Sequence, residues 1–238
     1  MLRIAILLLM AASTTFGCVC VGFSTPKGEW QRSSLVFVGR VERVSPKFAK
    51  RRFGPRRATV RVEEAFKGVQ KDQLIEIDQT GSNCELKYSK GWRWLLYLKL
   101  QKGGVWLSPG CDRSNAVELA SDDLRFLRAL PQAVDRTRIS GEVILSGNHS
   151  RPLSDVTVTL TPNGGSATTA VTDEYGVFEI YDLPKGSYTV SVRVPEGLKP
   201  DFGFVSGPRT FSHQFPLTVT LDDSHATVVF HLTSANEK

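Results

Sequence analysis

The chain lacks a hydrophobic run long enough to cross a membrane. Its longest apolar run, Ile4 to Ala12 in "MLRIAILLLMAASTTFG", is shorter than the roughly 20 residues that a spanning helix needs. One arginine precedes this run and small residues follow it, which is the three-part plan of a secretory signal peptide. We therefore expect residues 1–17 to be a signal peptide and the mature chain to have no transmembrane segment. The protein should be exported, to the periplasm, the cell surface or the extracellular space.

Motifs that carry enzymatic chemistry are also absent. The sequence contains no G-x-S-x-G turn, no P-loop, no dinucleotide-binding fingerprint and no H-E-x-x-H pair. Its four histidines have no metal-ligand spacing, and we expect structural or surface roles for His149, His213, His225 and His231. The sequence therefore predicts a protein that is not an enzyme, with no catalytic residues, no cofactor and no intrinsic metal.

Cysteine is scarce, since only Cys18, Cys20, Cys84 and Cys111 occur in 238 residues. They lack the C-x-x-C spacing of zinc ribbons and redox pairs. An even number in an exported chain favours disulfides, and all four should tie one domain because they lie in the first half. The rival interpretation is a lipid anchor on Cys18, which follows the small residue Gly17 and would leave one thiol unpaired.

Charge is distributed unevenly along the chain. Residues 18–137 hold 22 Lys and Arg against 13 Asp and Glu, whereas residues 138–238 hold 7 against 11. A basic unit followed by a mildly acidic one suggests two domains with different surfaces.

The positive charge is densest in "PKFAKRRFGPRRA", residues 46–58, which lies between two predicted strands and contains a Gly-Pro turn. We expect a protruding loop that contacts an anionic glycan, an anionic lipid surface or an acidic protein. The alternative is a solvated loop that aids solubility. Nucleic acid is not expected as a partner because the chain is exported. The basic residues are Lys47, Lys50, Arg51, Arg52, Arg56 and Arg57.

Short alternating segments with Gly and Pro turns fill residues 35–107, as is typical of an antiparallel barrel or sandwich. They are "SSLVFVGRVERVSP", "RATVRVEEAFKG", "DQLIEIDQ", "GWRWLLYLKL" and "GVWLSPGC". Alternation places Trp92 and Trp94 on the same face of one strand, where packing in the barrel is favoured over a ligand platform.

A helix is predicted over "SDDLRFLRAL", where Leu124, Leu127 and Leu130 recur at helical spacing. Ser121 is the expected N-cap, and the two aspartates that follow it suit the positive end of the helix. Pro131 should end the helix, and a linker should follow over residues 132–137.

The second half contains only strands and turns. "VTVTLTP" alternates apolar residues with threonine, and "TDEYGVFEIYDLPKGSYTVSVRVPEG" contains two strands around a turn. "LTVTLDD" and "ATVVFHL" are expected to form a hairpin pair at the end of the chain. Such a pattern over about 95 residues fits a small antiparallel β-sandwich.

The first half resembles the netrin-like module, an OB-type barrel shared by netrin C-termini, complement components and the tissue inhibitors of metalloproteinases. The likeness rests on the order of "CVC", "SSLVFVGRV", "EEAFKG", a cysteine before "GWRWLLYL", "SPGCDR" and the closing helix, over roughly residues 18–130. The resemblance implies disulfides between Cys18 and Cys84 and between Cys20 and Cys111.

The same resemblance implies a role for the N-terminal ridge Cys18, Val19 and Cys20. In the metalloproteinase inhibitors the amine and carbonyl of the first cysteine chelate the protease zinc, displacing the water that a catalytic zinc activates. Here Val19 stands where the inhibitors carry a small hydroxyl residue, and Val21 and Gly22 follow Cys20 without the usual proline. These departures weaken the inhibitor interpretation.

The second half resembles the carboxypeptidase regulatory-like domain, a transthyretin-type sandwich, through "ISGEVILSG", "RPLSDVTVTL" and "TDEYGVFEIYDLPKGSYTVSV". The expected organisation is a netrin-like OB-type five-stranded barrel with a C-terminal helix over residues 18–131, followed after the linker by a small antiparallel β-sandwich over residues 138–234. Such sandwiches are usually non-catalytic accessory domains.

The sequence therefore favours an exported, non-enzymatic binding protein whose partner is a protein or a polyanion. Two alternatives stay open. The first is a metalloprotease inhibitor that acts through Cys18, and the second is a structural envelope lipoprotein or spacer.

Overall fold

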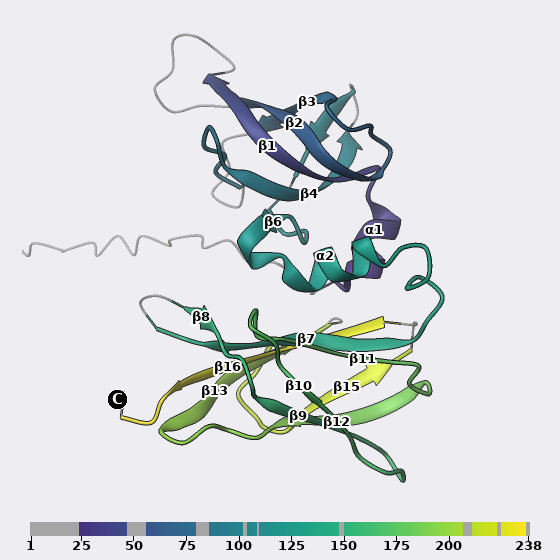
Figure 1. Cartoon of the computed structure of the whole chain (residues 1–238), viewed down its shortest axis with the longest axis vertical. Coiled ribbons are helices and arrows are strands. Elements are labelled where there is room, and N and C mark those ends of the chain that lie inside the picture. The colour runs from purple at the N-terminus through teal and green to yellow at the C-terminus, as the bar shows by residue number, and fades with distance from the viewer. Residues whose placement is uncertain are drawn as a thin grey trace, which may run out of the picture.

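The alternating segments of the first half form a closed barrel in a computed structural model of the chain. The structure describes residues 24–46, 56–79, 86–101, 104–108, 110–147, 150–206, 211–222 and 225–236. The barrel lies at one end of the molecule and a β-sandwich at the other, with helices α1 (Pro26–Arg32) and α2 (Ser121–Arg128) between them (Figure 1). The predicted mainly-β fold class is confirmed.

Five strands close the barrel in the order β1-β2-β3-β5-β4, because β1 also pairs with β4. β3 and β5 pair in parallel, with Ile77 opposite Trp106, and the other pairs are antiparallel. This is the OB-type arrangement expected from the sequence. The strands are β1 (Leu35–Pro46), β2 (Arg56–Lys67), β3 (Leu74–Gln79), β4 (Arg93–Gln101) and β5 (Val105–Leu107).

The barrel has apolar residues on both faces of β1 and β4. Phe37 and Leu96 point into the barrel, whereas Val36, Leu95 and Tyr97 point outward and pack against α2. A strand that is buried on both faces has a continuous apolar sequence, as in "LVFV" and "WLLYL". Both faces of β1 and β4 are thus buried, one in the barrel core and the other against α2.

The tryptophan prediction is half confirmed. Trp94 is buried in the barrel core, whereas Trp92 precedes β4 and is 56% exposed. The two rings stack with centroids 6.4 Å apart. Trp106 packs against the core cluster and is partly buried.

Helix α2 occupies the predicted segment but begins differently from the prediction. Ser121 is its first residue rather than its N-cap, and Ala120 precedes it with no side-chain cap. The reason is that the chain enters α2 directly from β6 (Asn115–Ala116) and a 3₁₀ turn, η1 (Val117–Leu119). The helix ends at Arg128, before Pro131. Neither α1 nor α2 has the length and apolar character that crossing a membrane requires.

The short helix α1 was not predicted, although the sequence signals it. Thr25 is the N-cap, and its Oγ1 accepts from the Gly28 N–H at 3.0 Å. Pro26 stands at the first helical position, where its missing N–H costs nothing. Glu29 is buried and forms ion pairs with Arg32 and with Lys99 of β4, both at 2.9 Å. These contacts attach α1 to the barrel.

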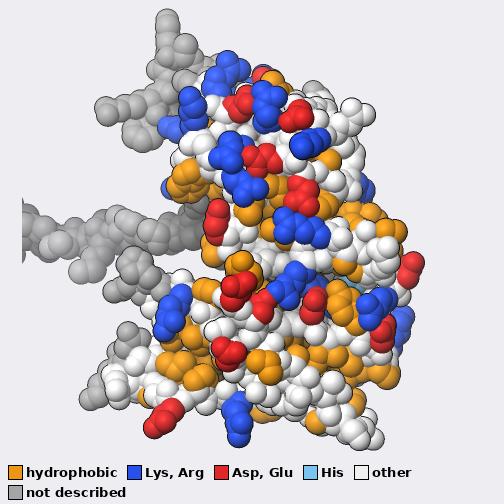
Figure 2. Space-filling view, in the orientation of Figure 1, with side chains coloured by type: hydrophobic (Ala, Val, Ile, Leu, Met, Phe, Trp, Pro, Cys, Tyr) orange, Lys and Arg blue, Asp and Glu red, His pale blue; other side chains and the backbone are white. Residues whose placement is uncertain are grey.

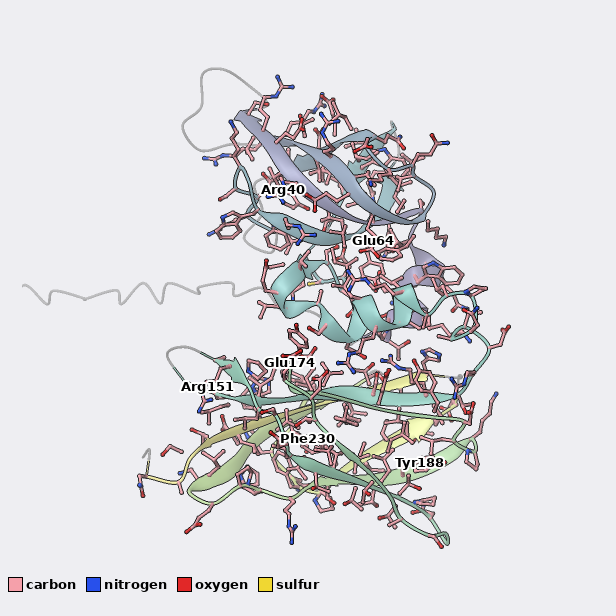
Figure 3. The ribbon with its side chains drawn as sticks, viewed as in Figure 1. Arg40, Glu64, Arg151, Glu174, Tyr188 and Phe230 are labelled. Carbon is pink, nitrogen blue, oxygen red and sulfur yellow. The ribbon has the colours of Figure 1, made fainter. Side chains whose placement is uncertain are left out.

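Two sheets enclose the core of the sandwich, and Tyr188 and Phe230 belong to its buried cluster (Figure 3). One sheet has the order β10-β9-β12-β15 and the other β11-β7-β16-β13-β14, with β8 paired to β7. The strands are β7 (Arg138–Leu145), β8 (Arg151–Pro152), β9 (Thr157–Pro162), β10 (Thr168–Val171), β11 (Val177–Tyr181), β12 (Gly186–Val192), β13 (Leu198–Val205), β14 (Phe211–Ser212), β15 (Leu217–Leu221) and β16 (His225–Ser234).

The hairpin predicted between the last two strands is wrong. β15 pairs with β12 in one sheet, whereas β16 lies between β7 and β13 in the other. Alternate residues of β15 and nearly all of β16 are buried, so the two strands reach the same core from opposite sheets. β16 runs parallel to β7, so the sandwich is antiparallel except for this pair.

The β7–β16 pair yields a prediction about Gly141. A Cβ at this position would lie 1.5 Å from the backbone oxygen of Val228 in β16. Gly141→Ala should therefore lower the free energy of unfolding by about 3 kcal/mol or more, since overpacking against backbone forces strands apart. Urea unfolding followed by circular dichroism measures the loss. Gly147→Ala is the matched control, because its Cβ meets no described atom within 4 Å. Equal losses in the two variants would contradict the prediction.

Candidate functional site

The interface between barrel and sandwich is built on the first turn of α2. The sequence predicted that Asp122 and Asp123 would only favour the positive end of this helix. In the structure they are 1% and 5% exposed and accept hydrogen bonds from two arginines. Figure 1 shows α2 lying between the barrel and β7 of the sandwich.

Arg113, in the loop before β6, holds both carboxylates from the barrel side. Its Nη2 lies 2.6 Å from Asp123 Oδ2 and 3.3 Å from Asp122 Oδ2. Its Nη1 donates to the carbonyl of Ser24 at 2.8 Å. The Tyr97 hydroxyl also donates to Asp123, at 2.7 Å. This cluster therefore joins the start of the described chain, the barrel and α2.

Arg138 holds the same cluster from the sandwich side. It is the first residue of β7, is fully buried, and donates from Nη2 to Asp122 Oδ1 at 2.6 Å. The same nitrogen donates to Glu179 of β11 at 2.8 Å. Asp122 thus forms ion pairs with one arginine from each domain.

Asp122 and Arg138 stay ionised despite their burial. Burial alone would raise the pKa of Asp122, but the guanidinium groups of Arg138 and Arg113 hold that pKa below its ordinary value. Burial would lower the pKa of Arg138, but the carboxylate of Asp122 outweighs it and raises that pKa. A buried ion network of this kind selects one arrangement of the two domains, because removing one partner leaves another charge buried and unpaired.

Further contacts hold the connection between the domains in place. The Phe126 ring of α2 meets the His225 ring of β16 edge to face, with centroids 5.0 Å apart. His225 Nε2 lies 3.2 Å from the carbonyl oxygen of Ala133, and Lys27 Nζ donates to the Val134 carbonyl. Burial lowers the pKa of His225 to about 4, so the ring is neutral near pH 7. Residues 132–137, expected to be a linker, are thus bound to both α1 and the sandwich.

Beside this network lies a notch, which we define as three adjoining cavities of 370, 250 and 560 Å³ that all border Leu119. The first two lie between the domains, and the third is lined by residues of the barrel domain alone. The barrel side supplies the segment 110–119 and Trp92. The sandwich side supplies the outer faces of β7, β13 and β16. Figure 2 shows the notch as the indentation between the upper and lower halves of the molecule. In Figure 3, Arg40 lies on its barrel side and Arg151 and Glu174 lie toward its sandwich side.

Apolar side chains gather around the notch. Six large hydrophobic side chains are exposed among the described residues, and three of them line its cavities. These are Trp92, Leu119 and Tyr175, which are 56%, 62% and 52% exposed. They come from the start of β4, from η1 and from the turn before β11. Trp92 and Leu119 line the same cavity of the barrel domain, and the arrangement of the two domains adds Tyr175 beside Leu119.

Glu142 lies where the 370 and 250 Å³ cavities meet. It projects from the centre of β7, between Val177 of β11 and Val229 of β16. Burial raises the pKa of its carboxyl group to about 7, and the nearby charge of Asp122 adds to this effect. No described residue forms an ion pair with Glu142. The notch therefore contains an acid that titrates near neutral pH.

The predicted cysteine site is only partly within the described residues. Cys111 is disulfide-bonded and borders the 370 Å³ cavity. Cys18, Val19, Cys20 and Cys84 lie outside the described residues. The pairing implied by the netrin-like resemblance, and the role of the N-terminal ridge, stay predictions.

The predicted polyanion site divides in the same way. Lys47, Lys50, Arg51 and Arg52 lie outside the described residues. Arg56 is exposed at the start of β2, whereas Arg57 forms ion pairs with Asp78 at 2.7 Å and with Glu76 at 3.1 Å.

The histidines and the acidic residues show no metal-holding arrangement among the described residues. His225 and His231 pack against aromatic rings, and His213 Nδ1 lies 3.0 Å from the Asp201 carbonyl oxygen. His149 lies outside the described residues.

Sequence reasoning did not find the notch. Leu119 and Glu142 are 23 positions apart and belong to different domains. The one available signal was Arg138, an arginine at the start of an apolar strand, directly after the expected linker. A charged residue at such a position needs a buried partner, and the Asp122-Asp123 pair was the nearest acidic candidate.

Comparison with known proteins identifies the second half only. Residues 138–210 match the carboxypeptidase regulatory-like domain family, which confirms the predicted resemblance. No curated protein matches the chain. The likeness of the first half to the netrin-like module stays a prediction.

Several solved structures are similar at low levels. The minor pilin GBS52 of Streptococcus agalactiae is 14% identical over 87% of this chain and 85% of that chain, with a TM-score of 0.33. The major pilin BcpA of Bacillus cereus is 12% identical over 76% and 38%, with a TM-score of 0.28. The pilus adhesin SpaC of Lactobacillus rhamnosus GG is 13% identical over 92% and 32%, with a TM-score of 0.30. This chain thus spans about a third of the latter two. TM-scores this low carry no argument about function.

The buried network yields a prediction about Arg138. Arg138→Met should lower the free energy of unfolding by about 3–5 kcal/mol, because Asp122 loses its ion pair to the sandwich. All four tryptophans lie in the first half, so tryptophan fluorescence reports the barrel and circular dichroism reports both domains. The urea unfolding transitions recorded by fluorescence and by circular dichroism should have the same midpoint in the wild type and different midpoints in Arg138→Met.

Arg136→Met is the matched control for this prediction, because Arg136 forms an exposed ion pair with Asp182 and lies over the Tyr181 ring, both in the sandwich. Its two transitions should stay coincident. If Arg138→Met behaved like this control, the ion network would not be what couples the domains.

Proposed function

We propose that this chain is an exported, non-enzymatic binding protein that engages a protein partner in the notch between its two domains. The observation that supports this most strongly is the gathering of Trp92, Leu119 and Tyr175, all more than half exposed, around adjoining cavities. Exposed apolar clusters with polar rims mark interaction sites, and such sites often lie between domains. A regulatory-like sandwich as the second domain fits an accessory rather than a catalytic role.

The expected N-terminal ridge would belong to the same surface. Ser24 lines the 370 Å³ cavity, and only three residues separate it from Cys20. The four steps from Cys20 to Ser24 span at most about 14 Å when extended. Cys111, the expected partner of Cys20, borders the same cavity. The ridge Cys18, Val19 and Cys20 and the notch are therefore proposed to be one continuous binding surface.

The basic segment is proposed as a second, weaker contact with an anionic glycan, an anionic lipid surface or an acidic protein. Several arginines elsewhere on the barrel are paired with acids. Arg40 and Arg93 share Glu63 at 2.8 and 2.6 Å, and Arg61 pairs with Glu42. Residues 47–56 hold five bases and no acid, and such a segment can attract polyanions over about a Debye length.

Photocrosslinking tests the notch directly. A benzoyl-phenylalanine at position 119 of the exported chain should yield one dominant crosslinked partner in the source cells, because Leu119 borders all three cavities. The same group at position 74 is the matched control, since Leu74 is 49% exposed on the barrel and lies away from these cavities. Mass spectrometry identifies the products. Equal yields of the same products from both positions would contradict the proposal, and an absence of any partner would favour the structural envelope lipoprotein or spacer.

A zinc-metalloprotease inhibitor is the second candidate, and the OB-type strand order supports it because the netrin-like resemblance implies that barrel. The mechanism requires a free Cys18 amine, whose ordinary pKa of about 7.7–8.0 leaves a usable unprotonated fraction near neutral pH. If the mature chain inhibits a metalloprotease, adding one alanine before Cys18 should abolish inhibition in an activity assay. Inhibition that survives the extension would exclude chelation by Cys18. The matched control is an alanine added after Lys238, which should have no effect.

A further inference from the structure

The carboxylate of Glu142 is unlike the other buried acids of the interface. Asp122 and Asp123 each accept from arginines, and their charges are balanced. Glu142 has no such ion pair within the described parts of the chain, although burial disfavours its charged form. Its neighbours across the sheet are Val177 and Val229. The nearby guanidinium of Arg113 favours the charged form of Glu142, but that guanidinium is held by Asp122 and Asp123.

The charges that face Glu142 make the notch negative overall. They come from every element around the two cavities: Asp112 and Arg113 from the loop before β6, Glu118 from η1, Asp122 and Asp123 from α2, Arg151 from β8, and His231 from β16. Burial lowers the pKa of His231, so its ring is neutral near pH 7. Arg113 and Arg138 balance Asp123 and Asp122, which leaves the carboxylates of Asp112 and Glu118 against Arg151, before Glu142 itself is counted. The notch is electrostatically complementary to a cation.

Apolar surface surrounds this acid on both sides. Phe204 and Val229 line the 370 Å³ cavity, and Ile144 and Tyr175 line the 250 Å³ cavity. Leu119 borders both cavities from the barrel side. A ligand that fits must therefore combine one positive charge with adjacent apolar groups.

We infer that the notch binds an extended peptide segment of a partner protein in which one lysine or arginine side chain pairs with Glu142 and the flanking apolar side chains contact Leu119 and Tyr175. Alternate side chains of an extended segment point to opposite sides. One basic side chain can thus enter the 370 Å³ cavity while its neighbours stay on the rim. This inference rests on the proposed binding function of the notch and names its recognition chemistry.

The pairing has a defined pH dependence. The pKa of Glu142 is about 7 in the free protein, so its carboxyl group is partly protonated at neutral pH. A lysine or arginine pairs only with the ionised form. Affinity for a basic segment should therefore increase as the pH rises from 6 to 8, until Glu142 is fully ionised.

Selection from a random peptide library tests the inference. A phage-displayed 12-residue library is selected against the mature chain and against three variants: Glu142→Gln, Leu119→Ser and Glu196→Gln. Glu196 is exposed in the turn before β13 and serves as the matched acidic control. The wild type and Glu196→Gln should enrich peptides with a lysine or arginine beside apolar residues, and Glu142→Gln should lose that enrichment.

A fluorescein-labelled copy of the most enriched peptide gives the quantitative readout. By fluorescence anisotropy, its dissociation constant should rise at least tenfold in Glu142→Gln and in Leu119→Ser at pH 8. Between pH 6 and 8 its affinity should increase for the wild type and stay constant for Glu142→Gln.

The outcomes separate this inference from the proposed function. Peptides that need Leu119 but show no basic preference, or that bind Glu142→Gln equally well, would overturn the cation pairing while leaving the notch as a binding site. No enriched peptide, together with a specific crosslink at position 119, would overturn the extended-peptide occupant alone. Affinity that rises in Phe23→Ser would identify the segment before Ser24 as the occupant and would also overturn the inference.

Discussion

The ion pair between Arg138 and Asp122 determines how the two halves of this protein meet. Asp122 belongs to α2, which is packed against the barrel through Leu124, Phe126 and Leu127. Arg138 begins β7, which lies between β11 and β16 in the facing sheet of the sandwich. Because both charges are fully buried, any rotation of one domain against the other would leave them unpaired away from water. Such pairs add little net stability compared with apolar packing, but the cost of breaking them is high. The two domains are therefore one body with a single arrangement, whereas interfaces within a chain are often mobile.

The features that depend on local pattern could be predicted from the sequence. The alternation of apolar and polar residues in "TVRV" and "LIEI" predicted barrel strands. The helical spacing of Leu124 and Leu127 predicted α2. Pairing between distant segments could not be predicted in the same way. The last two strands were predicted to form a hairpin because they are close in sequence. In the structure they belong to different sheets, and each buries apolar residues in the same core. Ser121 was predicted to be the N-cap because no local pattern shows that a 3₁₀ turn leads directly into α2.

The candidate site was beyond prediction for a similar reason. The residues singled out in the sequence were concentrated charges and cysteines, which stand out by type. The notch instead combines common residues, such as Leu119 and Glu142, whose importance comes only from position. Leu119 of η1 is exposed, and Glu142 is partly buried on β7, which lies beneath α2 (Figure 1). A sequence pattern reports the face of a strand on which Glu142 lies. It does not report which domain covers that face.

The parallel pairing of β7 and β16 has a mechanical consequence. Eight residues of β16, from His225 to Leu232, pair with the whole of β7 from Arg138 to Leu145. The barrel is attached at the beginning of β7, and the chain leaves the sandwich at the opposite end, beyond β16 (Figure 1). Tension applied between the barrel and the C-terminal end therefore pulls the two strands lengthwise past each other. In this shear geometry all the hydrogen bonds of the pair resist together, whereas the strands of a pulled hairpin would unzip one bond at a time. The fold is suited to carrying load along its length.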